Sequence, residues 1–365
     1  MPAASRCVLA SEGKAVAAPR PRQAVQRMAP YSPPTGGRAG KLRLDFNENT
    51  VGCSPRVLEY LTRHLDCNLF SVYPEYAETR RALAAFFRVA EAQLVLTNGT
   101  DEAIQVLVNT YIDDADDVLL PHPSYAMYRF YSDLAGASVR EVSYRPGDLA
   151  FPLDELLNAV RPETRAILIA NPNNPTGSGI NLDGIRRILD RAPDAAVLID
   201  EAYFEFSGVT ALGLVSEYAN LFISRTFSKA YGMAGLRIGC LLTQAGNAGF
   251  LRKCQSPYSV NLPAAIAVRA AVEDTRYVEE FTAEALKARA MLREGFDRLG
   301  IRHYPSQANF VLFDAGSRAI EIRDKLREAG VLVRDRSYEI AGCVRVTAGT
   351  REQIARFLTA LERIW

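Results

Sequence analysis

Two hydroxyl groups, a lysine and an arginine lie close together in the segment 225–237. Thr226, Ser228 and Lys229 form one short cluster, and Arg237 follows among several glycines. Hydroxyls and an arginine suit a phosphate dianion, because both donate hydrogen bonds to its oxygens. A deprotonated lysine beside that phosphate suits an aldehyde, because an amine and an aldehyde form a Schiff base. Phosphate and aldehyde together indicate pyridoxal 5′-phosphate, although an isolated Ser-Lys pair is more often a polar surface loop.

Other polar and aromatic residues follow apolar runs that are typical of buried strands. Five residues follow predicted strands in this way, including the lysine: Asn98, Tyr125, Asn174, Asp200 and Lys229. The apolar runs alternate with amphipathic helices, which indicates an α/β fold with a mostly parallel sheet. Ligands of such sheets bind at the carboxyl ends of the strands, so we expect these five residues to converge there.

The turn at 97–102 is a second candidate phosphate site. It follows a predicted strand at 93–96 and precedes a predicted helix at 103–111. Free backbone N–H groups at Gly99 and Thr100, together with the helix dipole, would face an anion. An ordinary helix start, capped by Thr100 with an acid in the first turn, explains the same residues.

The chain divides into four predicted parts. Residues 1–28 are rich in Ala, Pro and Arg and indicate a disordered extension. Residues 29–65 form an N-terminal arm and a segment of a small domain, and residues 66–258 form the large domain with the mostly parallel central sheet flanked by helices. Residues 259–365 form a smaller α+β domain that begins with a long helical tract, 264–299.

The composition excludes several classes of function. Net charge is +1, so no global field recruits nucleic acid or an anionic membrane, and no apolar run is long enough to span a bilayer. The six cysteines lack Cys-x-x-Cys spacing, and the three histidines are far apart. We therefore expect reduced thiols in the cytoplasm and no metal site.

From about residue 29 to its end, the chain resembles the class I/II aminotransferases of PLP fold type I. The likeness lies in short motifs in family order: Asn47-Glu48-Asn49, Tyr73-Pro74, Thr97-Asn98-Gly99, Pro123-Ser124-Tyr125, Asn171 to Gly177, Asp200 to Tyr203, Thr226 to Lys229 and Gly235-Leu236-Arg237. Within that group the chain is most similar to the histidinol-phosphate aminotransferases. Pro30-Tyr31, Val333 to Arg336, Val344 to Thr347 and Gly349-Thr350 carry this narrower likeness.

The resemblance implies a role for each cofactor residue. Lys229 would bond to pyridoxal 5′-phosphate and later carry a proton, while Asp200 would pair with the pyridine nitrogen. Asn174 and Tyr203 would hydrogen-bond to the 3′-oxygen, and Tyr125 would stack on the ring. The phosphate would be held by Gly99, Thr100, Thr226, Ser228, Arg237 and, from the partner subunit, Tyr73. The active sites would then be shared within a homodimer.

The same resemblance implies a step of histidine biosynthesis. L-histidinol phosphate and 2-oxoglutarate would become imidazole-acetol phosphate and L-glutamate. Arg345 would bind the phosphate of one substrate and a carboxylate of the other. The remaining expected substrate residues are Tyr31, Asn49, Asn309 and Arg334, although arginines in C-terminal strands also commonly lie on solvated surfaces.

Three other functions are compatible with these motifs. An aromatic amino-acid aminotransferase would use the same pocket, and a phosphothreonine decarboxylase would use the same scaffold and also needs a phosphate site. The third is a PLP-sensing regulator, which resembles this fold with a DNA-binding module in front. The residues before the match are too few and too rich in proline for such a module.

Overall fold

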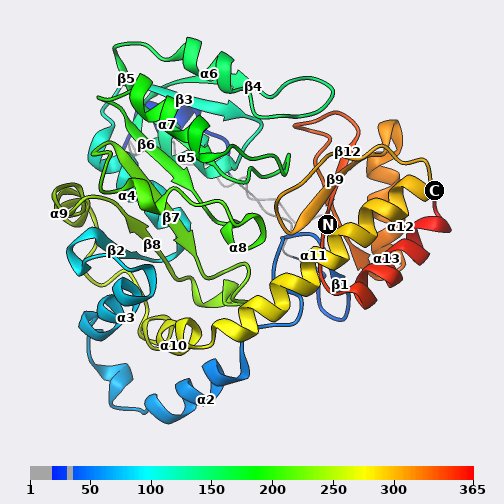
Figure 1. The fold of residues 1–365 in the computed structure, drawn as a ribbon, viewed down its shortest axis with the longest axis horizontal. Coiled ribbons are helices and arrows are strands. Elements are labelled where there is room, and N and C mark those ends of the chain that lie inside the picture. The colour runs from blue at the N-terminus through cyan, green and yellow to red at the C-terminus, as the bar shows by residue number, and fades with distance from the viewer. Residues whose placement is uncertain (1–18, 31–35) are drawn as a thin grey trace, which may run out of the picture.

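A mostly parallel sheet organises the larger part of the chain (Figure 1). The computed structural model describes residues 19–30 and 36–365. The sheet has seven strands in these residues, ordered β2 (Leu94–Thr97), β8 (Gly239–Leu242), β7 (Leu221–Thr226), β6 (Ala196–Asp200), β5 (Thr164–Ala170), β3 (Asp117–His122) and β4 (Ser138–Ser143). Within this sheet, β8 is the strand that runs antiparallel to its neighbours. The predicted α/β fold with a mostly parallel sheet is confirmed.

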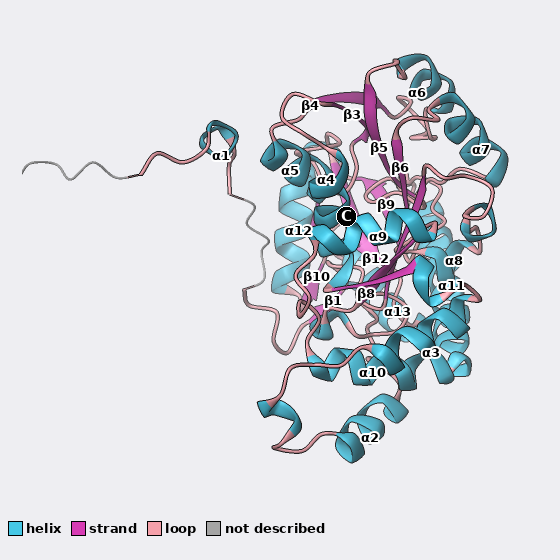
Figure 2. Cartoon of the chain, turned by 90° about the vertical axis from the view of Figure 1, so that its left-hand side faces the viewer, coloured by secondary structure: helices cyan, strands magenta, loops and turns pink. Residues whose placement is uncertain are grey.

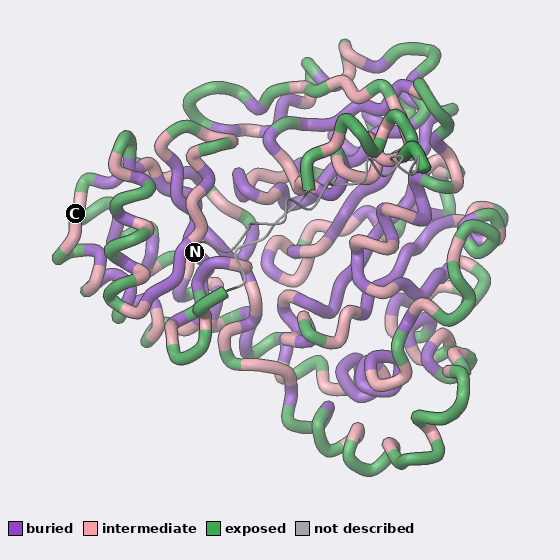
Figure 3. Tube along the Cα trace, turned by 180° about the vertical axis from the view of Figure 1, so that it is seen from behind, coloured by how far each residue is buried: buried purple, intermediate pink, exposed green. Residues whose placement is uncertain are grey.

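The central strands are apolar on both faces because helices cover both faces. In β6, Val197 and Ile199 belong to one buried cluster, whereas Ala196 and Leu198 belong to another. This alternation follows from the two-residue period of a strand. One face is covered by α4 (Gly99–Tyr111), α5 (Ala126–Ala135) and α9 (Ala245–Cys254), and the other by α3 (Ala77–Phe87), α6 (Leu153–Ala159), α7 (Leu182–Arg191), α8 (Phe204–Ser207) and α10 (Leu262–Glu273). Figure 3 shows buried stretches of chain running through the interior, with exposed stretches concentrated at the periphery.

A smaller antiparallel sheet with its own buried cluster lies beside the large one. Its strands are ordered β11 (Arg334–Asp335), β12 (Cys343–Thr347) and β9 (Phe310–Asp314), and they pack with α11 (Thr275–Arg298), α12 (Ala319–Glu328) and α13 (Arg351–Glu362). The parallel pair β1 (Leu42–Arg43) and β10 (Val331–Leu332) joins the N-terminal segment to this part. Helix α2 (Pro55–His64), capped by Ser54, packs against α10. The predicted limits of the domains stay predictions.

The predicted helical tract 264–299 is two helices, and the expectation of one tract is wrong at Asp274. Helix α10 ends before this residue and α11 begins after it. Asp274 has φ −102° and ψ 57°, which is outside the helical region. The hydroxyl of Ser54 donates to its carboxylate, and this contact ties the break to the start of α2.

The predicted disordered extension is described only in part. Residues 23–27 form a short helix, α1 (Gln23–Arg27), rather than unstructured chain, and Figure 2 shows it nearest to α5. The guanidinium of Arg22 donates to the carbonyl oxygen of Leu134. Residues 1–18 and 31–35, and with them Tyr31, lie outside the described residues. Among the helices that are described, none combines the length and the hydropathy that crossing a bilayer requires.

Candidate active site

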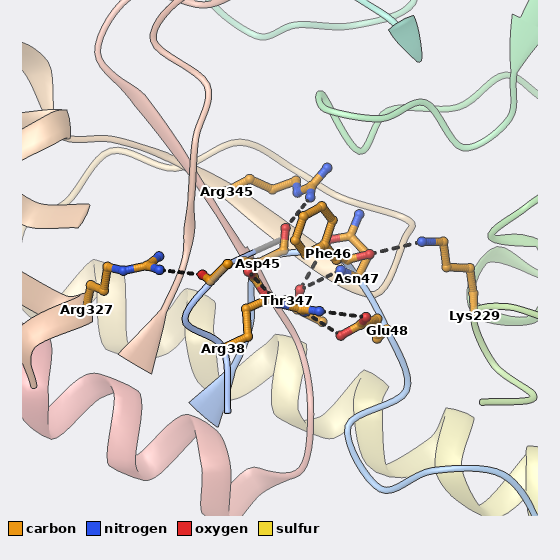
Figure 4. A network of polar contacts seen from close by, with 10 residues as sticks. Arg38, Asp45, Phe46, Asn47, Glu48, Lys229, Arg327, Arg345 and Thr347 are labelled. Carbon is orange, nitrogen blue, oxygen red and sulfur yellow. Dashed lines mark hydrogen bonds and ion pairs between the residues drawn. The ribbon is translucent and has the colours of Figure 1, made fainter. Parts of the chain in front are cut away.

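Lys229 lies in the loop after β7, where the N-terminal segment meets it. Its Nζ donates to the carbonyl oxygen of Phe46 at 3.0 Å (Figure 4). The loop continues through Gly232, which has φ +70°. A Cβ atom at that position would lie 2.2 Å from the carbonyl oxygen of Gly52. Glycine therefore lets the loop approach the N-terminal segment closely.

Asp200 ends β6 and is buried, with 3% of its surface exposed. One carboxylate oxygen accepts a hydrogen bond from Tyr128 Oη and the other from Ser224 Oγ, both at 2.8 Å. Burial raises the pKa of Asp200 to about 6, although both hydrogen bonds act in the opposite direction. The carboxylate is thus held in a fixed position, in surroundings that favour a nearby cation.

The N-terminus of α4 and Arg237 form one group of donors. Gly99 has φ +75°, and a Cβ atom there would lie 2.7 Å from Arg237 Nη2. Thr100 Oγ1 is buried and has no hydrogen-bond partner within residues 19–30 and 36–365. Arg237 Nη2 also donates to Asp101 Oδ2 at 3.2 Å. A phosphate at this helix terminus would share Arg237 with Asp101.

Three further predicted cofactor residues lie in adjoining loops. Tyr125 Oη donates to Asp101 Oδ1 at 2.7 Å, which links Tyr125 to the α4 terminus. Thr226 and Ser228 are both buried, and the backbone N–H of Ser228 donates to Thr226 Oγ1 at 3.1 Å. Ser228 directly precedes Lys229 and Thr226 lies three positions before it, so hydroxyls and amine lie together at the end of β7.

Tyr203 and Asn174 are connected to the smaller sheet through side chains. Asn47 Nδ2 donates to Tyr203 Oη at 2.9 Å, and Asn47 Oδ1 accepts from Thr347 Oγ1 in β12 at 3.2 Å. The Arg345 guanidinium donates to Asn174 Oδ1 through Nη1 and to the carbonyl oxygen of Asp45 through Nη2, the latter at 2.7 Å. The structure therefore brings Arg345 next to Asn174.

Arg345 and Arg334 lie opposite each other in β12 and β11. Arg345 is 4% exposed, and burial, followed by repulsion from Arg336, lowers its pKa to about 10. Neither arginine has a carboxylate partner among the residues that the structure describes. Arg334 Nη1 is buried without a hydrogen-bond partner in the same residues, and its guanidinium lies 5.4 Å from the centre of the Phe46 ring.

Two asparagines predicted to bind substrate have different surroundings. Asn309 Nδ2 donates to the carbonyl oxygen of Asn47 at 3.1 Å, and Asn309 Oδ1 is buried and unpaired among the described residues. Asn49 instead supports the loops: its Nδ2 donates to the carbonyl oxygen of Ala230, and its Oδ1 accepts from the N–H groups of Val51 and Gly52. A direct contact of Asn49 with substrate stays a prediction.

Tyr73 is not among the residues gathered around Lys229 in this chain. It is 75% exposed and stacks on Tyr258, with 4.4 Å between the ring centres. Its predicted role in the site of a partner subunit remains a prediction.

Sequence reasoning missed several residues of the site. Asn47, Phe46, Tyr128 and Ser224 were not predicted, yet each contacts a predicted residue. Ser224 had a usable signal, since it occupies the position in β7 that pairs with Asp200 in β6. Asn47 lies in the quoted Asn-Glu-Asn motif, but nothing in the motif tells which asparagine faces the site.

The residues present fit pyridoxal 5′-phosphate. The unpaired hydroxyl of Thr100, the α4 terminus and Arg237 suit its phosphate. The buried carboxylate of Asp200 suits a cationic ring nitrogen. Lys229 supplies the amine that an aldehyde requires. The arrangement can therefore hold all three functional groups of the cofactor.

Comparison with known sequences agrees with this chemistry. The model of the family "Aminotransferase class I and II" matches residues 39–361. A histidinol-phosphate aminotransferase from Symbiobacterium thermophilum is 37% identical in an alignment of 355 positions that covers 93% of this chain and 97% of the relative. One from Dehalococcoides mccartyi, strain BAV1, is 36% identical over 327 residues, covering 88% of this chain and 89% of the relative.

Solved structures show the same fold. The histidinol-phosphate aminotransferase of Sinorhizobium meliloti, determined in complex with pyridoxal 5′-phosphate, matches with a TM-score of 0.85 and 25% identity. The match covers 95% of this chain and 98% of that one. The Clostridium acetobutylicum enzyme of the same name matches with a TM-score of 0.81 and 26% identity, over 88% of this chain and 98% of the other.

Proposed function

The chain belongs to the class I and II aminotransferases, and on that premise we propose that it transfers the amino group of L-histidinol phosphate to 2-oxoglutarate. It is a pyridoxal 5′-phosphate-dependent aminotransferase that acts on small molecules. The products would be imidazole-acetol phosphate and L-glutamate, which places the reaction in histidine biosynthesis. Relatives that match this chain over most of their length are named histidinol-phosphate aminotransferases, and these names support this substrate.

The observation that carries the choice of substrate is the pair Arg334 and Arg345. Like charges opposite each other in neighbouring strands destabilise a sheet, and so does a buried cation without a directly paired acid; Glu339, whose charge acts on both arginines, forms its ion pair with Arg336. A bound dianion offsets both costs. The phosphate of histidinol phosphate supplies such a dianion, and 2-oxoglutarate supplies a carboxylate in the second half of the reaction.

We assign the cofactor to the residues at the ends of the parallel strands. Lys229 would hold its aldehyde, Asp200 its ring nitrogen, and the α4 terminus with Arg237 its phosphate. Thr226 and Ser228 would add hydroxyl donors to the phosphate. When bound, the cofactor supplies an electron sink for the negative charge that develops on the substrate carbon.

The chain's own residues orient the groups and move the proton. Lys229 Nζ would take the proton from the substrate carbon and hold it for the return transfer. The carbonyl oxygen of Phe46 lies 3.0 Å from this Nζ and fixes its direction. Tyr203 Oη and the Asn174 amide would hydrogen-bond to the 3′-oxygen, and Asn47 positions the Tyr203 hydroxyl.

We also propose a homodimer whose sites include Tyr73 of the partner subunit. The exposure of Tyr73 supports this, and so do further exposed apolar side chains in the same stretch: Val51, Leu58, Phe70 and Val72. A second copy that covers them would bury apolar area and bring the tyrosine to a phosphate. The five described cysteines are free, which supports a cytoplasmic enzyme.

A single half-reaction tests the proposal. Protein loaded with cofactor is mixed with L-histidinol phosphate and no keto acid, and conversion to pyridoxamine phosphate is followed by absorbance. L-phenylalanine and phosphothreonine are run in parallel. We expect conversion with histidinol phosphate at a rate constant about tenfold or more above that with phenylalanine. Conversion with phenylalanine alone would assign an aromatic substrate, and release of carbon dioxide from phosphothreonine would assign a decarboxylase.

A further inference from the structure

Residues 45–48 contact much of the predicted site through their main chain (Figure 4). Three carbonyl oxygens of this segment accept hydrogen bonds from side chains of the site: Asp45 from Arg345 at 2.7 Å, Phe46 from Lys229 at 3.0 Å and Asn47 from Asn309 at 3.1 Å. The position of the segment therefore determines where these side chains point.

The same segment carries two carboxylates, and both bind Arg38. Asp45 accepts from Nη2 at 2.9 Å and from Nε at 3.1 Å. Glu48 accepts from Nη2 at 2.6 Å and from Nη1 at 3.2 Å. The side chains of Arg38, Asp45 and Glu48 are 16%, 7% and 22% exposed. One guanidinium thus satisfies two largely buried acids with bidentate geometry.

Arg38 is itself held in place from two sides. Its guanidinium lies 4.5 Å from the centre of the Phe46 ring, which also contacts Arg334. Arg327, on α12, donates to the carbonyl oxygen of Gly36 at 2.7 Å and anchors the loop that carries Arg38. Arg38 is therefore held beside the Phe46 ring, with 16% of its side chain exposed.

The cations of the site are close enough to attract these acids. Burial raises the pKa of Glu48, but the hydrogen bonds and charge of Arg38, followed by the charges of Arg43 and Lys229, lower it overall. Asp45 already contacts Arg345 through its carbonyl oxygen. If Arg38 were absent, two buried carboxylates would lack a cation, and pairing with Arg345 or Lys229 would relieve that cost.

We propose that Arg38 is a positioning residue that sequesters Asp45 and Glu48, so that Arg345 stays free to bind the substrate anion. The inference rests on the proposed function, in which Arg345 binds a phosphate or a carboxylate. It explains why Arg345 and Arg334 remain without acids, among the described residues, although two acids lie in the adjoining segment.

Calorimetric titration of the cofactor-loaded enzyme with glutarate tests the inference. Glutarate has the two carboxylates of 2-oxoglutarate but no ketone, so it binds without reacting. Arg38→Gln is expected to raise the dissociation constant about tenfold, because the released acids compete for Arg345. The matched control is Arg43→Gln, which removes the same charge from an exposed side chain nearby and should leave the constant within about twofold.

A triple variant separates sequestration from simple support. Arg38→Gln combined with Asp45→Asn and Glu48→Gln lacks the clamp but also lacks the acids. If Arg38 acts by sequestering the acids, the triple variant should have a dissociation constant for glutarate within about threefold of wild type. If Arg38 only holds the segment in place, the triple variant should bind glutarate as weakly as Arg38→Gln, because all four hydrogen bonds are gone. Should Arg38→Gln not fold, the triple variant decides by the same criterion.

The outcomes for the inference and for the proposed function differ. Unchanged affinity for glutarate in Arg38→Gln would overturn the proposed sequestration but not the proposed function. A triple variant that binds glutarate as weakly as Arg38→Gln would have the same meaning. Wild-type enzyme that does not bind glutarate would count against 2-oxoglutarate as a substrate, and the inference would fall with it.

Discussion

At the scale of single residues, burial determines what Asp200 can do. Its carboxylate is held by Tyr128 and Ser224, and no cation of the described residues pairs with it. Burial raises its pKa to about 6, so near neutral pH most molecules carry a buried and uncompensated negative charge. Such a charge favours a protonated ring nitrogen beside it, which is the protein's contribution to the cofactor's chemistry.

This raised pKa predicts a pH-dependent stability in cofactor-free protein. The folded state holds the Asp200 proton more tightly than the unfolded chain does. The stabilisation that this proton gives the folded state is therefore lost as the pH rises from 3.8, the ordinary pKa, to about 6, the raised one. Asp200→Asn removes this titration. The free energy of unfolding of Asp200→Asn, measured relative to wild type, should therefore increase by roughly 1 kcal/mol between pH 5 and pH 8.

Urea denaturation of both proteins at the two pH values measures this difference. The exposed Asp190→Asn is the control, and its difference from wild type should not depend on pH. Parallel stability curves for wild type and Asp200→Asn would show that burial does not perturb the carboxyl group.

Lys229 is the second prediction at this scale. Lys229→Ala should lose both turnover and covalent retention of the cofactor after borohydride reduction, because no amine remains to bond the aldehyde. Mass spectrometry of the reduced protein makes the measurement. Lys253→Ala, which changes an exposed lysine at the end of α9, should keep the added mass. Retention of the mass by Lys229→Ala would place the bond on another lysine.

At the scale of elements, the start of α4 depends on one glycine. Gly99 combines a left-handed backbone with a close approach of Arg237 to the position that a Cβ atom would occupy. A side chain at residue 99 would therefore push the guanidinium away from the helix terminus. The phosphate would lose a charged donor while the helix dipole remained.

We expect Gly99→Ala to raise the dissociation constant of pyridoxal 5′-phosphate about tenfold or more. Quenching of protein fluorescence during titration of cofactor-free protein gives the constant. Gly246→Ala is a matched control, because Gly246 lies in α9 with open space around it and should even favour the helix. Equal affinity of both variants for pyridoxal 5′-phosphate would show that Arg237 does not bind the phosphate.

The elements also show where sequence reasoning reaches its limit. The apolar runs predicted the strands of the large sheet and placed Lys229 and Asp200 at their ends, because burial on both faces leaves a clear pattern. An apolar run has no direction, so the reversal of β8 was not predictable. The break at Asp274 has no Pro or Gly to mark it, and the contacts of Asn47 with Tyr203 and Thr347 join residues far apart in the chain.

At the scale of the whole molecule, the surface around Tyr73 is the feature that the single chain leaves unexplained. Two stacked tyrosines, Tyr73 and Tyr258, stand at the surface, and Phe70 and Val72, which are close to Tyr73 in the chain, are exposed as well. Apolar groups that gather on a surface commonly mark a contact with another chain. The proposed homodimer would cover them and complete two sites at once.

Complementation between two impaired variants tests these shared sites. Lys229→Ala and Tyr73→Phe are unfolded together, mixed in equal amounts and refolded. If Tyr73 serves the partner's site, half of the dimers are mixed, and one of their two sites is intact, so about a quarter of wild-type activity should return. Each variant refolded alone is the control. Activity no higher than the mean of the two controls would place Tyr73 outside the partner's site.

The contacts of residues 45–48 have a consequence for how this chain can change. Every amino acid supplies a carbonyl oxygen, so substitution of Phe46 leaves its acceptor for Lys229 in place. Insertion or deletion of one residue after Arg38 is different, because each carbonyl would move to a neighbour's position and the two acids would separate from the guanidinium. The segment is therefore constrained in its length more strictly than in its residue types.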